Sequence, residues 1–186
     1  RQESRGKGQG KALHAAARDN RIRISGVVRE SIVDGPGLRF VLFTQGCPHK
    51  CPGCHNPSTH DFSGGYEIEW ERVFEEFSKN PLLKGITLSG GEPFVQSAAL
   101  IPLAKAVKDT GKDIVIYSGY TYEQLLTMAE ENTDIKDLMS LCDILIDGPF
   151  IPEKRDLTLL FRGSSNQRII DLKKSDFSPC PFELSL

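Results

Sequence analysis

The sequence predicts an α/β fold in the form of an incomplete, laterally open (βα) barrel. Strand-like and helix-like segments alternate from residue 22 onward with short connections, which is typical of βα units around a mainly parallel sheet. A closed eight-stranded barrel takes about 250 residues, whereas this chain has 186 residues. We therefore expect a barrel that does not close.

The first two predicted strands flank a turn. Ile24–Glu30 and Leu38–Thr44 are rich in β-branched and aromatic residues, as strands are. The run Asp34-Gly35-Pro36-Gly37 between them has the composition of a turn. A loop with three cysteines follows the second strand directly.

The rest of the domain alternates helices with strands. Apolar residues spaced three and four apart predict the helices, and short β-branched runs predict the strands between them. The expected order is helix 70–77, strand Gly85–Ser89, helix 100–107, strand Asp113–Tyr117, helices Tyr122–Glu130 and Asp134–Leu141, and strands Asp143–Asp147 and Gln167–Asp171.

The composition is that of a soluble globular protein. Hydrophobic residues make up 39% of the chain, and 23 Lys and Arg against 25 Asp and Glu give a net charge of −2. This balance favours neither nucleic acid nor an anionic membrane as a partner. No apolar run approaches the roughly 20 residues that cross a bilayer. The polar residues 1–20 lack a secretory h-region, so we expect a cytoplasmic location, with reduced thiols.

Residues 1–20 are also low in β-branched and aromatic side chains. Such a segment buries too little apolar surface to order itself. We expect it to be a disordered extension or one introduced for expression, which leaves residues 21–186 as a single domain.

Polar motifs follow several of the predicted strands. Besides the cysteine loop they are Gly90-Gly91-Glu92, Tyr117-Ser118-Gly119-Tyr120 and Asp147-Gly148. In α/β folds, reactive groups gather in loops at the carboxyl ends of the strands. We therefore expect the motifs to meet on one rim.

The cysteine loop carries the strongest chemical signal. Cys47, Cys51 and Cys54 lie within eight residues, and no fourth ligand follows at a short fixed spacing. A cubane iron–sulfur cluster held by three thiolates keeps one iron open, and an open metal position is where chemistry can occur. A zinc knuckle completed by His49 or His55 is an alternative, although structural zinc usually takes paired ligands from two segments. A disulfide fits a reduced compartment less well.

The remaining two cysteines are expected to be structural. Cys142 directly precedes a predicted strand and should be a small core residue. Cys180 lies between two prolines near the end of the sequence and should be exposed.

Several motifs together resemble a known family. The spacing Cys47-x-x-x-Cys51-x-x-Cys54 resembles the cluster motif of radical S-adenosylmethionine (SAM) enzymes, and Ser89–Pro93 resembles the loop that holds the methionine part of SAM in that superfamily. Four runs resemble the activating proteins of anaerobic ribonucleoside-triphosphate reductase, in the glycyl radical enzyme activating family. These runs are Asp34–Arg39, Cys51–Asn56, Leu145–Phe150 and Phe161–Gln167.

The resemblance implies a radical SAM domain over residues 21–186, with Cys47, Cys51 and Cys54 as ligands of a [4Fe-4S] cluster. SAM would bind the open iron and be cleaved reductively to methionine and a 5′-deoxyadenosyl radical. That radical would take hydrogen from one glycine of the reductase. An electron donor such as flavodoxin or ferredoxin would reduce the cluster. The cluster and SAM would carry out the chemistry, and no side chain of the protein is expected to be catalytic.

The resemblance also implies contacts to SAM. Gly53, Cys54 and His55 would line its adenine side, where His55 either stacks or is only a solvated loop histidine. Gly90 and Gly91 would let SAM approach the strand-end backbone, although paired glycines also mark ordinary turns.

Two acidic residues complete the expected cofactor site. Glu92 would bond the ammonium group of SAM or merely lead into the next helix. Asp147 would bond the ribose or only begin a turn. His49 is expected to be exposed. The sequence gives a suitable location but no role for Ser118, Tyr120, Arg162, Asn166 and Arg168.

Two other functions remain open at this point. An activase of pyruvate formate-lyase, or of another glycyl radical enzyme, is compatible with Cys54-His55-Asn56-Pro57, whereas the run Arg162–Gln167 favours the reductase. A non-catalytic zinc or iron–sulfur module is the alternative from a different class.

Overall fold

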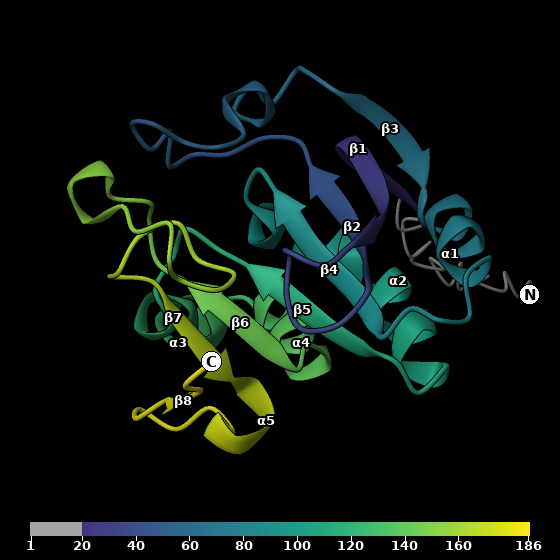
Figure 1. The fold of residues 1–186 in the computed structure, drawn as a ribbon. Helices are drawn as coiled ribbons and strands as arrows, with labels where there is room; N and C mark the ends of the chain where they lie inside the picture. Colours follow the sequence, from purple (N-terminus) through teal and green to yellow (C-terminus); the bar gives the residue numbers. More distant parts are fainter. Residues whose placement is uncertain (1–19) are drawn as a thin grey trace, which may run out of the picture.

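Eight strands form one mixed sheet in the computed structural model, which describes residues 20–186 (Figure 1). The spatial order is β3-β1-β2-β4-β5-β6-β7-β8. The strands are β1 (Arg21–Ser31), β2 (Arg39–Thr44), β3 (Tyr66–Glu69), β4 (Gly85–Gly90), β5 (Asp113–Tyr117), β6 (Ile144–Asp147), β7 (Arg168–Asp171) and β8 (Phe182–Glu183). Except for Asn20, the predicted extension over residues 1–20 lies outside the described residues.

Helices connect most of these strands. The α-helices are α1 (Trp70–Ser78), α2 (Ser97–Asp109), α3 (Tyr122–Glu131), α4 (Thr133–Leu141) and α5 (Leu172–Ser175), with short 3-10 helices at Pro57–Thr59, Pro93–Gln96 and Pro152–Lys154. None of the helices within residues 20–186 combines the length and apolarity that crossing a bilayer demands.

The sheet is mixed, which corrects the prediction of a mainly parallel one. β2, β4, β5 and β6 pair in parallel, whereas β1 pairs antiparallel with β2 and β3, and β7 pairs antiparallel with β6 and β8. A parallel crossover takes about a dozen residues or more. The connection Ile32–Leu38 is too short for one, so the chain turns back and β2 runs antiparallel to β1.

The predicted helices α1 to α4 are confirmed to within a few residues, as are the predicted strands. The sequence did not predict β3, α5 or β8. β3 and α5 have four residues each and β8 has two. Segments this short do not complete a recognisable period, and their pairing and packing partners, rather than local sequence, determine them.

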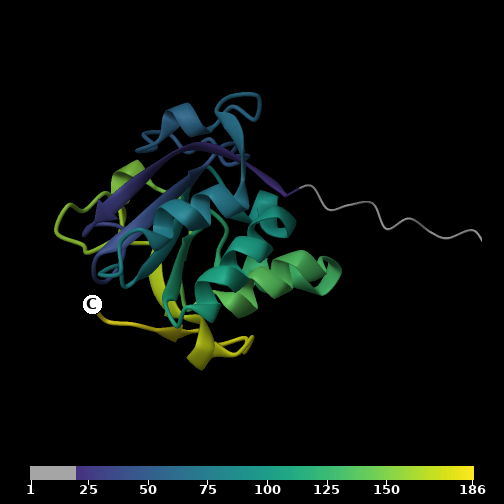
Figure 2. The same cartoon turned by 90° about the vertical axis from the view of Figure 1, so that its right-hand side faces the viewer.

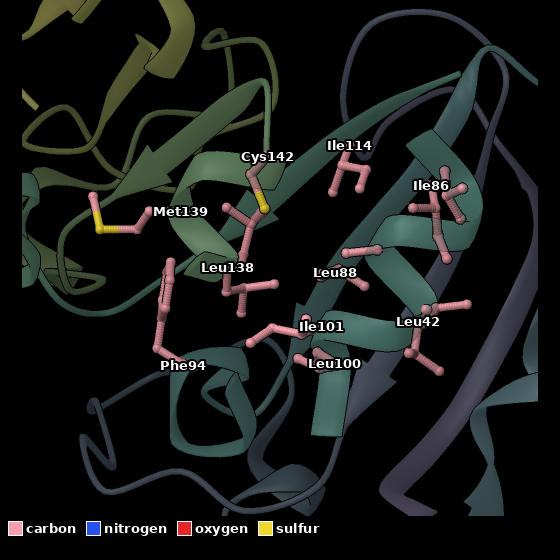
Figure 3. Close-up of a cluster of buried hydrophobic side chains, with 14 of the residues drawn as sticks. Leu42, Ile86, Leu88, Phe94, Leu100, Ile101, Ile114, Leu138, Met139 and Cys142 are labelled. Carbon is pink, nitrogen blue, oxygen red and sulfur yellow. The ribbon is translucent and has the colours of Figure 1, made fainter. Parts of the chain in front are cut away.

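An apolar core fills the space between the sheet and the helices. Figures 1 and 2 show α2, α3 and α4 on one side of the sheet. Alternate strand residues point to that side, as the strand period of two requires. The core includes Leu42, Ile86, Leu88 and Ile114 from the strands and Leu100, Ile101, Leu138 and Met139 from the helices (Figure 3).

The two structural cysteines are located as predicted. Cys142 is fully buried among the core side chains (Figure 3), and this burial raises the pKa of its thiol. Cys180 is exposed. Neither thiol belongs to the cysteine loop after β2.

The opposite face of the sheet carries a buried cation. Arg39 is fully buried, and its Nη1 atom lies 2.7 Å from Oδ1 of Asp113. The guanidinium also donates to the carbonyl of Pro36 (3.0 Å) and to Oγ1 of Thr87 (2.7 Å). Thr87 Oγ1 in turn donates to the carbonyl of Asp34 (2.7 Å). Arg39 and Thr87 therefore anchor the turn between β1 and β2 to the face of the sheet opposite the helices.

Candidate functional site

The carboxyl ends of the parallel strands open into one cavity of about 540 Å³. All four polar motifs contribute to its lining, as predicted. They supply the three loop cysteines, Gly90 and Gly91, Tyr117 to Gly119, and Gly148. Residues from the β1–β2 turn and from the loop before β7 complete the wall. The site therefore combines segments that lie far apart in the sequence.

The cysteine loop is closed at its neck by backbone hydrogen bonds. Gly46 N donates to the carbonyl of Thr59 (2.7 Å), and Cys47 N donates to the carbonyl of His60 (3.2 Å). Gln45 is buried, and its side-chain amide donates to the carbonyls of Ser58 (3.0 Å) and residue 61 (2.6 Å). These hydrogen bonds thus hold the two ends of the loop together.

Three thiols of this loop share the cavity. Cys47 is buried, and Cys51 and Cys54 are half-buried. Within residues 20–186, no group of three or more His, Cys, Asp or Glu side chains is arranged to hold a single metal ion. The thiolates of a cubane bind separate irons, so three thiols distributed around one cavity fit a cluster.

The environment of the Cys47 sulfur contains opposing influences. Burial raises the pKa of the Cys47 thiol, and the charges of Glu92 and Cys51 raise it further. Hydrogen bonds from the backbone N–H groups of His49 and Lys50 lower this pKa. Burial has the largest effect. The N–H groups stabilise the thiolate, which is the form that binds iron.

Gly90 and Gly91 bring the loop after β4 against the cysteine loop. Gly91 N donates to the carbonyl of Thr44 (2.7 Å), and Glu92 N donates to the carbonyl of Gly46 (2.9 Å). A Cβ atom at Gly90 would lie 2.5 Å from Thr44 N, and one at Gly91 would lie 2.3 Å from the Gly46 oxygen. Neither position accepts a side chain, so this backbone reaches the cavity uncovered.

Glu92 is fully buried and does not line the cavity. Its carboxylate accepts hydrogen bonds from Phe94 N (3.1 Å), Ser118 Oγ (3.0 Å) and Gly119 N (2.8 Å). The first of these bonds caps the 3-10 helix after β4, and the others reach the loop after β5. The side chain therefore joins two strand-end loops from behind the cavity wall.

His49 is not exposed, which corrects the prediction for this residue. Its side chain is 17% exposed, and Nε2 lies 2.8 Å from Oε2 of Glu92. Its ring packs edge-on against Tyr120, with centroids 4.4 Å apart. The prediction was wrong because the cysteine loop folds back over the ends of β4 and β5, which local sequence does not reveal.

The predicted adenine side is divided between the surface and the cavity. His55 is exposed, lines the cavity, and has its ring 5.0 Å from that of Phe150. Gly53 is exposed, has a φ of +71°, and does not line the cavity. A Cβ at Gly53 would lie 3.3 Å from the Phe150 ring. Phe150 thus supplies an aromatic ring beside the position that is glycine in this loop.

Asp147 is buried and bonded within the protein. Its Oδ2 accepts from Tyr122 N (2.8 Å), and both oxygens bond the guanidinium of Arg168, at 3.1 Å and 2.5 Å. Arg168 also pairs with Glu123 (2.7 Å). Neither Asp147 nor Arg168 lines the cavity. Together they tie the start of α3 to β7.

Of the other candidate residues, some line the cavity and some do not. Ser118 and Arg162 line the cavity, whereas Tyr120 and Asn166 do not. Asn166 donates to the carbonyl of Pro149 (2.8 Å). Arg162 contributes a cation to the wall.

Sequence reasoning missed several lining residues. They include Ile32, Val33, Phe150 and His60. Nε2 of His60 is buried without a hydrogen-bond partner among the described residues. Ile32 and Val33 are 74% and 70% exposed. Two adjacent apolar residues beside the Asp34–Gly37 turn were the one signal that could have identified the rim.

Comparison with known proteins gives concordant results. Residues 33–170 match a family described as a 4Fe-4S single cluster domain. A protein of Vibrio cholerae named anaerobic ribonucleoside-triphosphate reductase-activating protein is 39% identical over 146 residues, covering 74% of this chain and 90% of that protein. Its namesake in Escherichia coli is 34% identical over 150 residues, covering 76% and 94%.

Among solved structures, the crystal structure of QueE from Escherichia coli is similar with a TM-score of 0.44 and 17% identity, covering 54% of this chain and 53% of that one. The curated relatives extend over most of this chain and nearly all of their own length. From that identity and coverage, the chain belongs to the family of anaerobic ribonucleoside-triphosphate reductase-activating proteins.

Proposed function

We propose that this chain activates an anaerobic ribonucleoside-triphosphate reductase by generating a glycyl radical on it. The chain is a radical SAM enzyme with a [4Fe-4S] cluster. One observation carries the proposal: three thiols and the uncovered backbone of Gly90 and Gly91 line the same cavity. A cluster with an open iron and a ligand on the glycine loop would therefore lie next to each other.

The chain's own residues would hold both cofactors. Cys47, Cys51 and Cys54 would ligate the cluster and leave one iron for SAM. The bound cluster and SAM supply an electron and a cleavable sulfonium, from which methionine and a 5′-deoxyadenosyl radical arise. Gly90 and Gly91 would accept the methionine part of SAM at the strand-end backbone. The cavity of about 540 Å³ lies within the range of roughly 300–1,000 Å³ for small-molecule sites.

The structure supports some of the other predicted SAM contacts more strongly than others. His55 lines the cavity beside Phe150, which supports a place on the adenine side. Gly53 lies next to the same ring without lining the cavity. The hydrogen bonds of Glu92 and Asp147 favour positioning of the surrounding loops over direct contact with SAM.

The sheet supports an incomplete, laterally open barrel. β3 and β8 end the strand order and are not hydrogen-bonded to each other in residues 20–186. Exposed apolar side chains border the cavity from two loops, with Ile32 and Val33 before β2 and Leu160 (54% exposed) before β7. Exposed apolar patches mark sites of macromolecular contact. A glycine-bearing loop of the reductase would enter the cavity across this rim.

The cellular setting follows from the cofactor. An electron donor such as flavodoxin or ferredoxin would reduce the cluster. The cytoplasm is the compartment in which cysteine thiols stay available as ligands. The net charge of −2 supports neither nucleic acid nor a membrane as a further partner.

The test is a radical-transfer assay under anoxic conditions. The chain, reconstituted to about four irons per molecule and reduced, is mixed with SAM and the reductase. We expect 5′-deoxyadenosine and a glycyl signal by electron paramagnetic resonance (EPR). A reductase whose radical glycine is replaced by alanine is the matched control and should give no such signal.

Two outcomes would redirect the assignment. A glycyl signal on pyruvate formate-lyase, without one on the reductase, would make that enzyme the partner. One zinc per chain and no cleavage of SAM would leave a non-catalytic module.

A further inference from the structure

Two amide side chains join the loop before β7 to the loop after β6. Gln167 lines the cavity, and its Nε2 atom donates a hydrogen bond to the carbonyl of Gly148 (3.1 Å). Nδ2 of the neighbouring Asn166 donates to the carbonyl of Pro149 (2.8 Å). Gly148 and Pro149 directly follow β6, which ends at Asp147. Side chains from the end of one loop therefore hold the backbone of the other.

The oxygen of the same Gln167 amide organises its own loop. Oε1 accepts hydrogen bonds from Gly163 N (2.9 Å) and Ser164 N (3.2 Å). Because both of these partners are donors, this end of the amide is the oxygen, which leaves Nε2 as the end that donates to Gly148. One side chain thus bonds backbone groups of three residues in two loops.

The backbone of Gly163 contacts two aromatic rings of the cavity wall. A Cβ atom at Gly163 would lie 3.0 Å from Cε1 of His55 and 3.0 Å from Cδ2 of Phe150. The two rings lie 5.0 Å apart and are tilted by 45°, and all three residues line the cavity. Gln167 bonds Gly163 directly, and it bonds Gly148 two residues before Phe150. It therefore restrains two of the three segments that form this aromatic wall.

The loop before β7 needs such restraint. Phe161 has a φ of +62°, in the left-handed region that bulky residues rarely adopt. A conformation of this kind persists only where the surrounding structure holds it. The Tyr117 hydroxyl holds the carbonyl of Phe161 (2.6 Å), and Gln167 holds the N–H groups of Gly163 and Ser164. Loss of the Gln167 amide should therefore loosen the loop.

We propose that Gln167 is a positioning residue that holds Gly163 and Phe150 against His55 and so sets the affinity of the cavity for the adenine end of SAM. Adenine has a π face that stacks on aromatic side chains. The strength of such contacts depends on the separation and tilt of the rings. The inference rests on the proposed function for SAM as the ligand and for adenine beside His55, but not for the identity of the partner.

The decisive variant is Gln167→Leu, which has a side chain of similar size without donor or acceptor. Its first measurement is amide hydrogen exchange, followed by NMR, on the full chain without cofactor. We expect faster exchange at the N–H groups of Gly163 and Ser164, because these groups lose their acceptor. Exchange within β4 and β5 should equal that of the parent, which would show that the change is local.

The second measurement is the affinity of the reconstituted chain for SAM. Titration with SAM is followed through the EPR spectrum of the reduced cluster, in the absence of the reductase. We expect Gln167→Leu to bind SAM on the order of tenfold more weakly, as the loss of one or two hydrogen bonds would give. Gln167→Ala repeats the test with a smaller side chain that cannot clash within the loop.

A double-mutant cycle separates positioning of the aromatic wall from general disturbance. If Gln167 acts through Phe150, Gln167→Leu should change SAM affinity little in a Phe150→Leu background. A purely structural role would give the same loss in both backgrounds. Ser165→Ala is the matched control, because the Ser165 side chain is exposed in the same loop. Its SAM affinity should equal that of the parent.

Three results would overturn the inference. One is parent-like exchange at Gly163 and Ser164 in both Gln167 variants, and another is parent-like SAM affinity in both. The third is an equal loss of affinity in the parent and Phe150→Leu backgrounds. A parent chain that binds a cluster but no SAM would contradict the proposed function itself, and this inference with it. The two failures are therefore distinguishable.

Discussion

Toward the helices, β4 presents Ile86 and Leu88 to the apolar core, and toward the cavity side it presents Thr87 and Ser89. The same six-residue strand thus serves two faces with opposite chemistry. On the first face, many apolar contacts act together and none has a unique partner. On the second face, Thr87 has specific hydrogen-bond partners in Arg39 and the carbonyl of Asp34.

The difference shows in the buried charges. Arg39, Glu92 and Asp147 are each at most 1% exposed, and each has hydrogen-bond partners within the protein. Removing an apolar side chain costs packing, whereas removing a buried charge leaves its partners unpaired. Loss of one helix-side residue should therefore lower stability alone. Loss of one cavity-side residue should change stability and ligand binding together.

The largest contrast is expected between cysteines on the two faces. Cys47→Ala, Cys51→Ala or Cys54→Ala should each abolish the [4Fe-4S] cluster, because each removes one of three ligands. Cys142→Ala, in the helix-side core, should keep the cluster and lower the free energy of unfolding by about 1 kcal/mol. Iron and sulfide analysis after anoxic reconstitution measures the difference. Full iron in a loop-cysteine variant would contradict the ligand assignment.

A core truncation should give the next largest effect. Leu88 is 1% exposed in the helix-side core, and Leu88→Ala should lower the free energy of unfolding by about 3 to 4 kcal/mol. Urea denaturation of the chain without cofactor measures this change. Iron content after reconstitution should equal that of the parent, and a loss of iron would show that the two faces are not separable.

Replacing the buried Arg39 should lower the free energy of unfolding by less than the core truncation does, and it should also weaken SAM binding. Removing one partner of a fully buried pair costs roughly 3–5 kcal/mol. Because Asp113 is 26% exposed, we expect about 2 kcal/mol for Arg39→Met. The Asp34–Gly37 turn loses its anchor, so SAM affinity should also fall.

Arg39→Lys serves as the control for charge. It keeps the cation but not the fork that bonds Pro36, Thr87 and Asp113 together. SAM titration of the reconstituted variants is the measurement. Parent-like affinity in Arg39→Met would separate the turn from the cofactor site.

The smallest expected effect concerns Tyr117, whose hydroxyl donates to the carbonyl of Phe161 (2.6 Å). Tyr117→Phe should cost about 1 kcal/mol near neutral pH. Burial raises the pKa of Tyr117 above its ordinary value of 10.0. Above about pH 10 the unfolded chain therefore loses this proton while the folded chain retains it, so the parent loses stability as pH rises.

The Phe variant has no such proton to lose. The difference in unfolding free energy between parent and variant should therefore shrink above about pH 10, where other alkaline effects are common to both chains. Urea denaturation at neutral pH and above pH 10 measures it. A difference that grows with pH would show that Tyr117 ionises more readily in the folded chain.

Local pattern was sufficient for the long elements. α1 to α4 and the central strands have apolar periodicity over several turns or residues, so their sequence alone locates them. The existence of the short elements and the direction of the outer strands could not be predicted from local sequence. β3 and β8 exist through hydrogen bonds to β1 and β7, and those partners lie far away in the sequence or beyond a loop.

In the site, too, some features could be predicted from local sequence and others could not. The spacing of Cys47, Cys51 and Cys54 and the Gly90-Gly91 pair predicted the kind of cofactor through their resemblance to the motifs of a known family, and such motifs can be read from local sequence. Only the tertiary structure decided that His49 binds Glu92 and that Asp147 binds Arg168. It also decided which side chains reach the cavity. The physical reason is that a hydrogen bond depends on distance between atoms, and folding sets that distance between residues which the sequence keeps apart.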